Sequence, residues 1–222
     1  MQQDTFSLVM SYMPLMLQGL LTTIQVSLEA AVIGELFGLL LALLRRGKSK
    51  VINGIIGVYI SFVRGTPLLV QIFVIYYAVS MLGLNLPAAV TGVIALSLNS
   101  GGFVAEILRG GFSAIPRGQY ESGYALGMSK AMVTRRIVLP QVIKIVLPQF
   151  ITEVINVIKV SPLLSVITVV DLTRVAQRLV QQTNVCIPFY ATIAVFYFIL
   201  CAALEGVVNA VSKKLNKSLS VG

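Results

Sequence analysis

The stretch from Gly65 to Ala105 contains no charged side chain. A soluble domain of ordinary composition rarely holds such a run, whereas a membrane helix needs about 20 mostly apolar residues to cross roughly 30 Å of hydrocarbon. The sequence Gly83-Leu84-Asn85-Leu86-Pro87 interrupts the stretch and is typical of a tight turn. We therefore expect two membrane spans here, at about residues 66–83 and 88–108.

Three further apolar runs are long enough to cross a bilayer, at about residues 20–44, 141–168 and 188–208. Hydrophobic residues make up 57% of the 222 residues and charged residues only 11%, which excludes an ordinary soluble domain. Residues 8–19 are also apolar, but joining them to the first span gives a helix too long for the bilayer. We expect them to form a separate interfacial helix that ends near Gly19, with Pro14 close to its start. The sequence therefore predicts an all-α integral membrane protein with five spans in a single domain, residues 1–222.

Five spans place the two termini on opposite sides of the membrane, and the basic residues select the orientation. With the N-terminus outside and the C-terminus in the cytoplasm, fourteen of the 17 Lys and Arg residues lie on the cytoplasmic side. The fourteen are Arg45, Arg46, Lys48, Lys50, Arg64, Arg109, Arg117, Lys130, Arg135, Arg136, Lys144, Lys213, Lys214 and Lys217. Because no Lys or Arg precedes Arg45, a cleavable signal peptide is not expected.

The longest cytoplasmic connection, residues 109–140, has a helical pattern of its own. Pro116 suits a helix start, and residues 121–126 and 130–138 can form two short helices about a turn. A helix-turn-helix with small residues can approach a groove on a partner closely, because small side chains leave the backbone accessible. The residues that mark the pattern are Glu121, Ser122, Gly123, Gly127, Ile137, Leu139 and Pro140.

This pattern resembles the EAA loop of binding-protein-dependent ABC importers, in which Glu-Ala-Ala is followed by three residues, Gly, nine residues and Ile-x-Leu-Pro. The anchors Glu121, Gly127 and Ile137 match with their spacing, as does Leu139-Pro140, whereas Ser-Gly replaces the two alanines. The resemblance implies the fold of a type I ABC importer permease, with a loop that couples it to ATPase subunits. It also implies four kinds of association: with a second permease copy or paralogue, two cytoplasmic ATPase subunits, an extracytoplasmic amino acid-binding protein and the membrane.

Other segments resemble the polar amino acid branch of this family, and together the resemblance covers nearly the whole chain. One is the stretch Arg64-Gly65-Thr66-Pro67-Leu68-Leu69-Val70-Gln71, and the other comprises Asn99 and residues 105–111. For Asn99 we prefer an interhelical hydrogen bond, and for Glu106 and Arg109 an i,i+3 pair near the interface. The resemblance implies a polar amino acid importer in a bacterial plasma membrane, which is the inner membrane in Gram-negative cells.

A polar stripe follows one face of the fourth span. Thr152, Glu153, Asn156 and Lys159 recur at three- and four-residue spacings. A charge near the bilayer centre costs about 2.5–3.5 kcal/mol on insertion scales, so these side chains should face a cavity, a partner or each other. In one interpretation they line the substrate pathway with Ser161: the carboxylate and amide contact the charged groups of an amino acid, and the lysine neutralises the site or binds a carboxylate. In the other they form a structural network, and the sequence does not decide between the two.

Several chemistries have no support in the sequence. No segment matches G-x-x-x-x-G-K-[ST], so the chain has no phosphate-binding loop and is not itself the ATPase. It contains no histidine, and no nucleophile motif, so we expect neither a catalytic nor a metal site. The resemblance assigns ATP and Mg²⁺ to the partner ATPase subunits. The basic residues lie in short clusters between apolar runs, which favours membrane topology over nucleic acid binding.

Three alternatives remain at the level of the sequence. An ABC permease for another small solute would share the coupling loop. A secondary transporter and a membrane scaffold would not explain that loop, and no internal repeat of the kind common in secondary transporters is visible. The sequence also leaves open which amino acid is carried, whether the two permease subunits are identical, and what Glu29 and Glu35 do.

Overall fold

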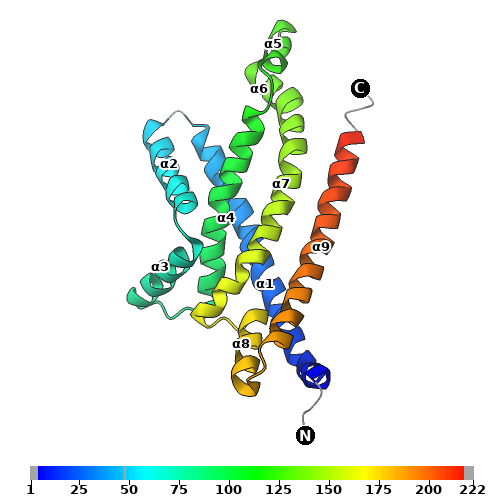
Figure 1. Cartoon of the computed structure of the whole chain (residues 1–222). Coiled ribbons are helices and arrows are strands. Elements are labelled where there is room, and N and C mark those ends of the chain that lie inside the picture. Colours follow the sequence, from blue (N-terminus) through cyan, green and yellow to red (C-terminus); the bar gives the residue numbers. More distant parts are fainter. Residues whose placement is uncertain (1–4, 48, 218–222) are drawn as a thin grey trace.

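The computed structural model describes residues 5–47 and 49–217, and over these residues the chain is helical without a strand. Short α6 and a π-helical turn lead into α7, and a 3-10 segment follows it (Figure 1). The elements are α1 (Thr5–Arg45), α2 (Lys50–Gly65), α3 (Leu68–Met81), α4 (Ala88–Ser113), α5 (Arg117–Ala125), α6 (Lys130–Val133), η1 (Thr134–Val138), α7 (Leu139–Val160), η2 (Ser161–Ile167), α8 (Leu172–Thr183) and α9 (Ile187–Lys217).

Four continuous helical segments in the described part of the chain are long and apolar enough to cross a membrane: Phe6–Arg45, Ala88–Ser113, Lys130–Ile167 and Ile187–Lys213. The pair α2 and α3 passes the same test jointly but is bent by 115°. The all-helical prediction is therefore confirmed, and the number of spans is four or five according to whether the bent pair counts as one. The predicted second span, residues 66–83, corresponds to the second half of this bent pair.

Helix α1 continues through the break that the sequence analysis places near Gly19. Pro14 lies inside the helix, and Gly19 packs against α8, where a Cβ atom would come within 2.9 Å of Leu172 Cα. The glycine thus serves a close helix contact and does not end the helix. Val9 and Met16, in the segment expected to be a separate helix, are buried in a core formed with α8 and α9. The prediction of a separate interfacial helix was wrong because these long-range contacts support one helix of 41 residues, about 60 Å long.

The centre of the bundle is the crossing of α1 and α4, where small residues let the two backbones approach closely. A Cβ at Gly34 would lie 2.9 Å from Ser100 Cβ, and a Cβ at Gly38 would lie 2.5 Å from Val104 Cβ. Small residues at such spacing allow membrane helices to pack tightly. Helix α4 is accordingly the most enclosed span, and it carries one wall of each cavity described below.

The two ends of the bundle differ in what they carry (Figure 1). The short helices α5 and α6 project from one end, where the last turns of α1 and α9 also lie. At the opposite end lie the start of α1, helix α3 and the amphipathic helix α8. Helix α4 runs to Ser113, so the first residues of the predicted 109–140 connection are helical, and residues between α4 and α7 form the projection.

Candidate functional site

A cavity of about 330 Å³ lies beside the break between α2 and α3, with α4 and α7 as its other walls. Its volume is at the lower end of the range of small-molecule sites. It joins two groups of residues that the sequence analysis singled out separately, one from the Arg64–Gln71 segment and α4, the other from the polar stripe of α7. The polar side chains that line it are Arg64, Thr66, Asn99, Glu153, Asn156 and Lys159.

Gln71 shapes the cavity wall at the bend. Because Pro67 has no backbone N–H, the Val63 carbonyl lacks the donor that a continuing helix would supply four residues later. The Gln71 side chain takes this place: its Nε2 donates to Val63 O at 2.8 Å and to Thr66 Oγ1 at 2.8 Å. Its Oε1 accepts from Asn99 Nδ2 at 2.9 Å. The expected interhelical hydrogen bond of Asn99 is therefore present, and it connects α4 to the bent pair.

Glu153 is the buried charge of the cavity, with 7% of its surface exposed. Its Oε2 accepts a hydrogen bond from Asn156 Nδ2 at 3.3 Å, one turn further along α7. Glu35 on α1 lies close enough for its carboxylate to repel that of Glu153, although Glu35 does not line the cavity. A buried carboxylate without a cation beside it is costly, and a cationic ligand group would offset that cost.

The other two candidate pathway residues on this segment have different surroundings. Lys159 lies on the cavity wall, and its Nζ is 3.7 Å from Glu205 Oε1 on α9, with both side chains more than half exposed. Such an exposed pair contributes little to stability and leaves the ammonium available for other contacts. Ser161 is buried outside the cavity lining, and its hydroxyl donates to the Ile158 carbonyl at 2.9 Å. The structure therefore places Ser161 at the end of α7 and not with the other three.

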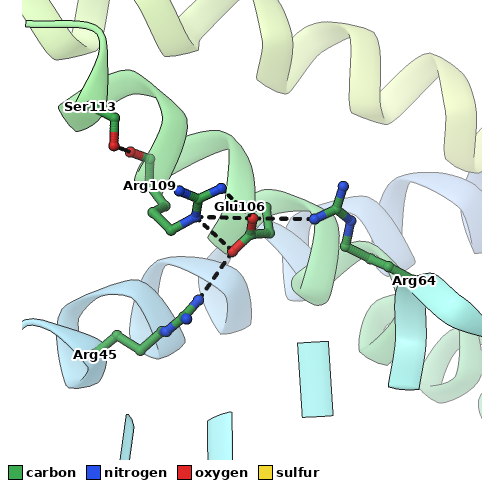
Figure 2. A network of polar contacts seen from close by, with 5 residues as sticks. All are labelled: Arg45, Arg64, Glu106, Arg109 and Ser113. Atoms are coloured by element: carbon green, nitrogen blue, oxygen red, sulfur yellow. Dashed lines mark hydrogen bonds and ion pairs between the residues drawn. The ribbon is translucent and has the colours of Figure 1, made fainter. Parts of the chain in front are cut away.

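Figure 2 shows a second polar cluster, nearer the end that carries α5, in which three arginines converge on Glu106. Arg109 makes the expected i,i+3 pair, with Nη2 at 2.8 Å from Oε2. Arg45 of α1 lies at 3.0 Å and Arg64 of α2 at 3.2 Å from the carboxylate, which is 15% exposed. The sequence analysis missed this convergence, since it used Arg45 only as a sign of topology. Four charged groups from three helices fix where α1, α2 and α4 meet.

The predicted coupling loop forms the helix-turn-helix that its sequence indicates. Gly127 has φ of +74°, in the left-handed region that glycine adopts without strain, between α5 and the N-cap Ser129 of α6. A Cβ at Gly123 would lie only 2.7 Å from Val133 Cγ2. From the sequence, the small residue at this position is expected to serve a contact with a partner. The small residue at 123 is thus needed inside the loop, where α5 rests on the following helical segment.

The remaining motif residues divide between the exposed tip and the base of the loop. Glu121 and Ser122 are exposed on α5, and Leu126 beside the turn is 80% exposed. At the base, Leu139 and Pro140 begin α7, and Ile137 lies in the π-helical turn before them. Gln141 Nε2 donates to Gln119 Oε1 at 3.0 Å and so ties α5 to α7. An exposed apolar side chain on a projecting, well-anchored turn is suited to contact a partner.

Comparisons with known proteins agree with this arrangement. Residues 34–217 match the family of binding-protein-dependent transport system inner membrane components. A putative glutamine transport system permease of Rickettsia conorii is 35% identical over 200 residues, covering 89% of this chain and 91% of that protein. An L-cystine transport system permease of Bacillus subtilis is 33% identical over 208 residues, covering 93% and 89%.

Solved structures share the fold. A chain of an amino acid ABC transporter, crystallised with histidines, is 38% identical with a TM-score of 0.91 over 96% of this chain and 100% of that one. A chain of the MetNI methionine ABC transporter is 16% identical with a TM-score of 0.72, over 92% and 98%, and so supports the fold alone.

The all-helical fold and these similarities define an integral membrane permease subunit. The chain belongs to the binding-protein-dependent ABC importer permeases. Subunits of this kind have no ATPase site of their own, and ATP is hydrolysed by partner subunits.

Proposed function

We propose that this chain forms half of the pathway of an ATP-driven importer for polar amino acids. The cavity at the α2–α3 break carries the proposal, because it combines the anionic Glu153 and the cationic Arg64 and Lys159 with neutral hydrogen-bonding groups. A zwitterionic amino acid needs this combination. The similarity to permeases named for glutamine and cystine, and to an amino acid transporter, points to the same class of substrate.

Within this cavity, Glu153 and Asn156 contact the charged groups of the amino acid. The buried carboxylate favours an ammonium or another cationic group, and the amide keeps the carboxylate oriented through its 3.3 Å hydrogen bond. Lys159 neutralises the site or binds the substrate's carboxylate from the more exposed side. Ser161 contributes through its position at the end of α7, where it supports the helix that carries the other three.

The orientation in the proposal has the N-terminus outside, the C-terminus in the cytoplasm and the bent pair as the fifth span, in a bacterial plasma membrane. Arg45 ends α1, Arg109 lies in the last turns of α4, and Arg117 begins α5, whereas Arg174 and Arg178 belong to α8. In Figure 1, α5 and the end of α1 lie at one end of the bundle, and α8 lies at the other. An excess of basic residues at the α5 end supports a cytoplasmic location for it. The bent pair then places its break, with the cavity, between the two membrane surfaces.

In the proposed mechanism, two such permease subunits enclose the pathway, and the partners are two cytoplasmic ATPases and an extracytoplasmic amino acid-binding protein. ATP and Mg²⁺ bind only to the ATPase subunits. Their closure moves the loop around Gly127 as a rigid unit, because α5 is tied to α7 by the Gln119–Gln141 hydrogen bond. Helix α7 also carries Glu153, so the same helix transmits movement of the loop to the cavity and switches its access.

The test is uptake by the complete transporter in proteoliposomes, with a panel of radiolabelled amino acids. We expect Glu153→Gln to raise KM or change the order of preference among substrates, because the variant loses the charge that faces the cavity. Glu29→Gln is the matched control, since Glu29 is exposed and accepts a hydrogen bond from Gln25 on the same helix. Unchanged kinetics for Glu153→Gln would reject the binding role. Transport of other small solutes but no amino acid would reject the substrate class.

A further inference from the structure

A second, larger cavity lies outside the proposed pathway. It is a groove of about 730 Å³ between the final turns of α1, the end of α4 and the first half of α7. The groove runs along segments that are apolar enough to lie in the membrane. Its lining is mainly aliphatic and aromatic, with Leu39, Leu43, Leu108, Ile143, Leu147 and Phe150 among the residues that form it.

The rim of this groove, at the end that carries α5, is positively charged. Arg45, Arg46 and Arg109 all border it. Arg46 lies over the Phe112 ring, with Cζ at 4.4 Å from the ring centre, which holds the guanidinium at the mouth. Glu106 is the carboxylate bonded to Arg45 and Arg109, so these three arginines and one glutamate carry a formal charge of +2. The Glu106 contacts also hold two of the guanidinium groups in place (Figure 2).

An apolar groove that ends in a cluster of fixed positive charges complements an amphiphile with an acyl chain and an anionic head. In a membrane, that chemistry belongs to an anionic phospholipid, whose phosphate accepts hydrogen bonds from guanidinium groups. We propose that the groove binds one anionic phospholipid, with an acyl chain along α7 and the phosphate at Arg45, Arg46 and Arg109. A zwitterionic lipid binds more weakly, because its head carries no net charge to offset the charge of the rim.

The lipid site also reaches the coupling loop. Tyr120 of α5 lines the same groove, so the bound lipid contacts the first helix of the loop together with the first half of α7. The lipid therefore lies between the membrane and the segment that moves when the ATPases close.

The experiment is native mass spectrometry of the full chain in detergent, with 1-palmitoyl-2-oleoyl phosphatidylglycerol or phosphatidylcholine added at equal concentrations. The two lipids share their acyl chains and differ in head-group charge. We expect the chain to retain one phosphatidylglycerol preferentially. Both faces of the protein are accessible in detergent, so the result does not depend on the proposed orientation or on transport.

Three variants separate charge from groove shape. Arg46→Gln should weaken retention of phosphatidylglycerol by about fivefold, since one basic residue near a membrane contributes about 1 kcal/mol to such binding. Arg46→Lys should keep most of it. Ile143→Trp fills the groove without changing charge and should also reduce retention. The control Arg178→Gln removes one positive charge from exposed α8 at the other end of the molecule and should leave retention unchanged.

Equal retention of the two lipids would overturn the proposal, as would equal losses in Arg46→Gln and Arg178→Gln. Inorganic phosphate provides a further arm. If phosphate at millimolar concentration displaced phosphatidylglycerol, the site would be one for free anions and the acyl groove would have no role. Normal retention in Ile143→Trp, with the variant eluting as the wild-type chain does in size-exclusion chromatography, would lead to the same rejection.

Discussion

The Gln71 side chain replaces the backbone N–H donor that Pro67 lacks. Pro67 leaves the Val63 carbonyl without its helical partner, and the Gln71 amide supplies the missing hydrogen bond while it also binds Asn99 of α4. A buried carbonyl left unpaired costs about 1–3 kcal/mol, and the hydrogen bond from this single side chain offsets that cost at the bend beside the cavity. At the residue scale, this polar side chain thus acts where a helix is interrupted.

Asp171 is a second such residue, at the start of α8 and outside the spans. Its Oδ1 accepts a hydrogen bond from the Arg174 backbone N–H at 2.8 Å, which caps the helix. Burial raises the pKa of this carboxyl from 3.8 to about 6, although the hydrogen bonds from the backbone and the charge of Arg174 oppose the shift. Because the folded protein prefers the protonated form, the stability from this group is fully present below about pH 3.8 and is lost as the pH rises through about 6.

We therefore predict that Asp171→Asn raises the unfolding temperature of the purified chain at pH 7.5 but changes it little at pH 4. Asparagine keeps an oxygen for the helix cap and removes the buried charge. A shift of about two pKa units corresponds to roughly 3 kcal/mol, which sets the upper limit of the gain. The measurement is thermal unfolding in detergent at both pH values, with Glu121→Gln, an exposed carboxyl, as control. A loss of stability at pH 7.5 would mean that the charged form is the one the fold prefers.

At the scale of elements, the predicted coupling loop is shaped by contacts within the loop itself. Gly123 leaves room for Val133, Ser129 caps α6 through the Met132 N–H, and Gly127 permits the turn at φ of +74°. The exposed Leu126 beside the turn is then presented at a fixed place. These features explain why the loop can be recognised from its sequence. Position 123 needs a small residue and position 127 favours glycine, for reasons that do not depend on a partner.

Replacing Gly127 with valine should abolish or strongly reduce uptake by the complete transporter while the chain still inserts into the membrane. A β-branched residue in the left-handed region is strained by about 1–3 kcal/mol, and no neighbouring atom lies within 4 Å of the position, so the effect comes from the turn itself. Uptake in vesicles and the amount of membrane-inserted chain are the two measurements. Gly118→Val is the matched control, because Gly118 also has open space around it but lies in helix α5. Wild-type uptake by the Gly127 variant would exclude a coupling role for this turn.

Elements with strong local patterns were predictable from the sequence, and elements defined by distant contacts were not. The apolar run before Arg109 and the turn at Gly127 predicted α4 and the loop, because hydrophobicity and glycine act locally. Helix α1 was divided wrongly, since the reason for its continuity is a contact between Gly19 and Leu172. The predicted span at residues 66–83 contains α3, and the structure adds α2 before it across a bend of 115°.

The same difference between local patterns and distant contacts applies to the candidate site. The spacing of Glu153, Asn156 and Lys159 predicted a shared helix face, and these three residues do line one cavity. Their joint site with Arg64 and Asn99 could not be foreseen, because it depends on how α4 and the bent pair pack against α7. Arg45 joins Glu106 across 61 positions of sequence, and no local pattern marks such a pair.

At the scale of the whole molecule, the chain leaves large apolar surfaces exposed. Helix α9 is the least buried of the four candidate spans in the described part of the chain, and Phe198 and Ile199 are more than half exposed. Such an apolar face is suited to contact with lipid or with another protein, because its exposure to water is unfavourable. Leu126, beside the turn of the loop, is likewise an exposed apolar side chain.

Because partner subunits hydrolyse ATP, ATPase activity should depend on which subunits are present in the assay. The purified chain should show no ATPase activity, because its sequence has no phosphate-binding loop, and addition of the partner ATPases should create activity that a substrate-loaded binding protein stimulates. Leu126→Asp should reduce that stimulation severalfold, because it places a charge at the proposed apolar contact. The control is Leu84→Asp, on an exposed turn between α3 and α4. This variant should leave the contact with the ATPases intact. Steady-state phosphate release measures both. Hydrolysis by the chain alone, or full stimulation of the Leu126 variant, would require that energy enter the transporter by a route other than this loop.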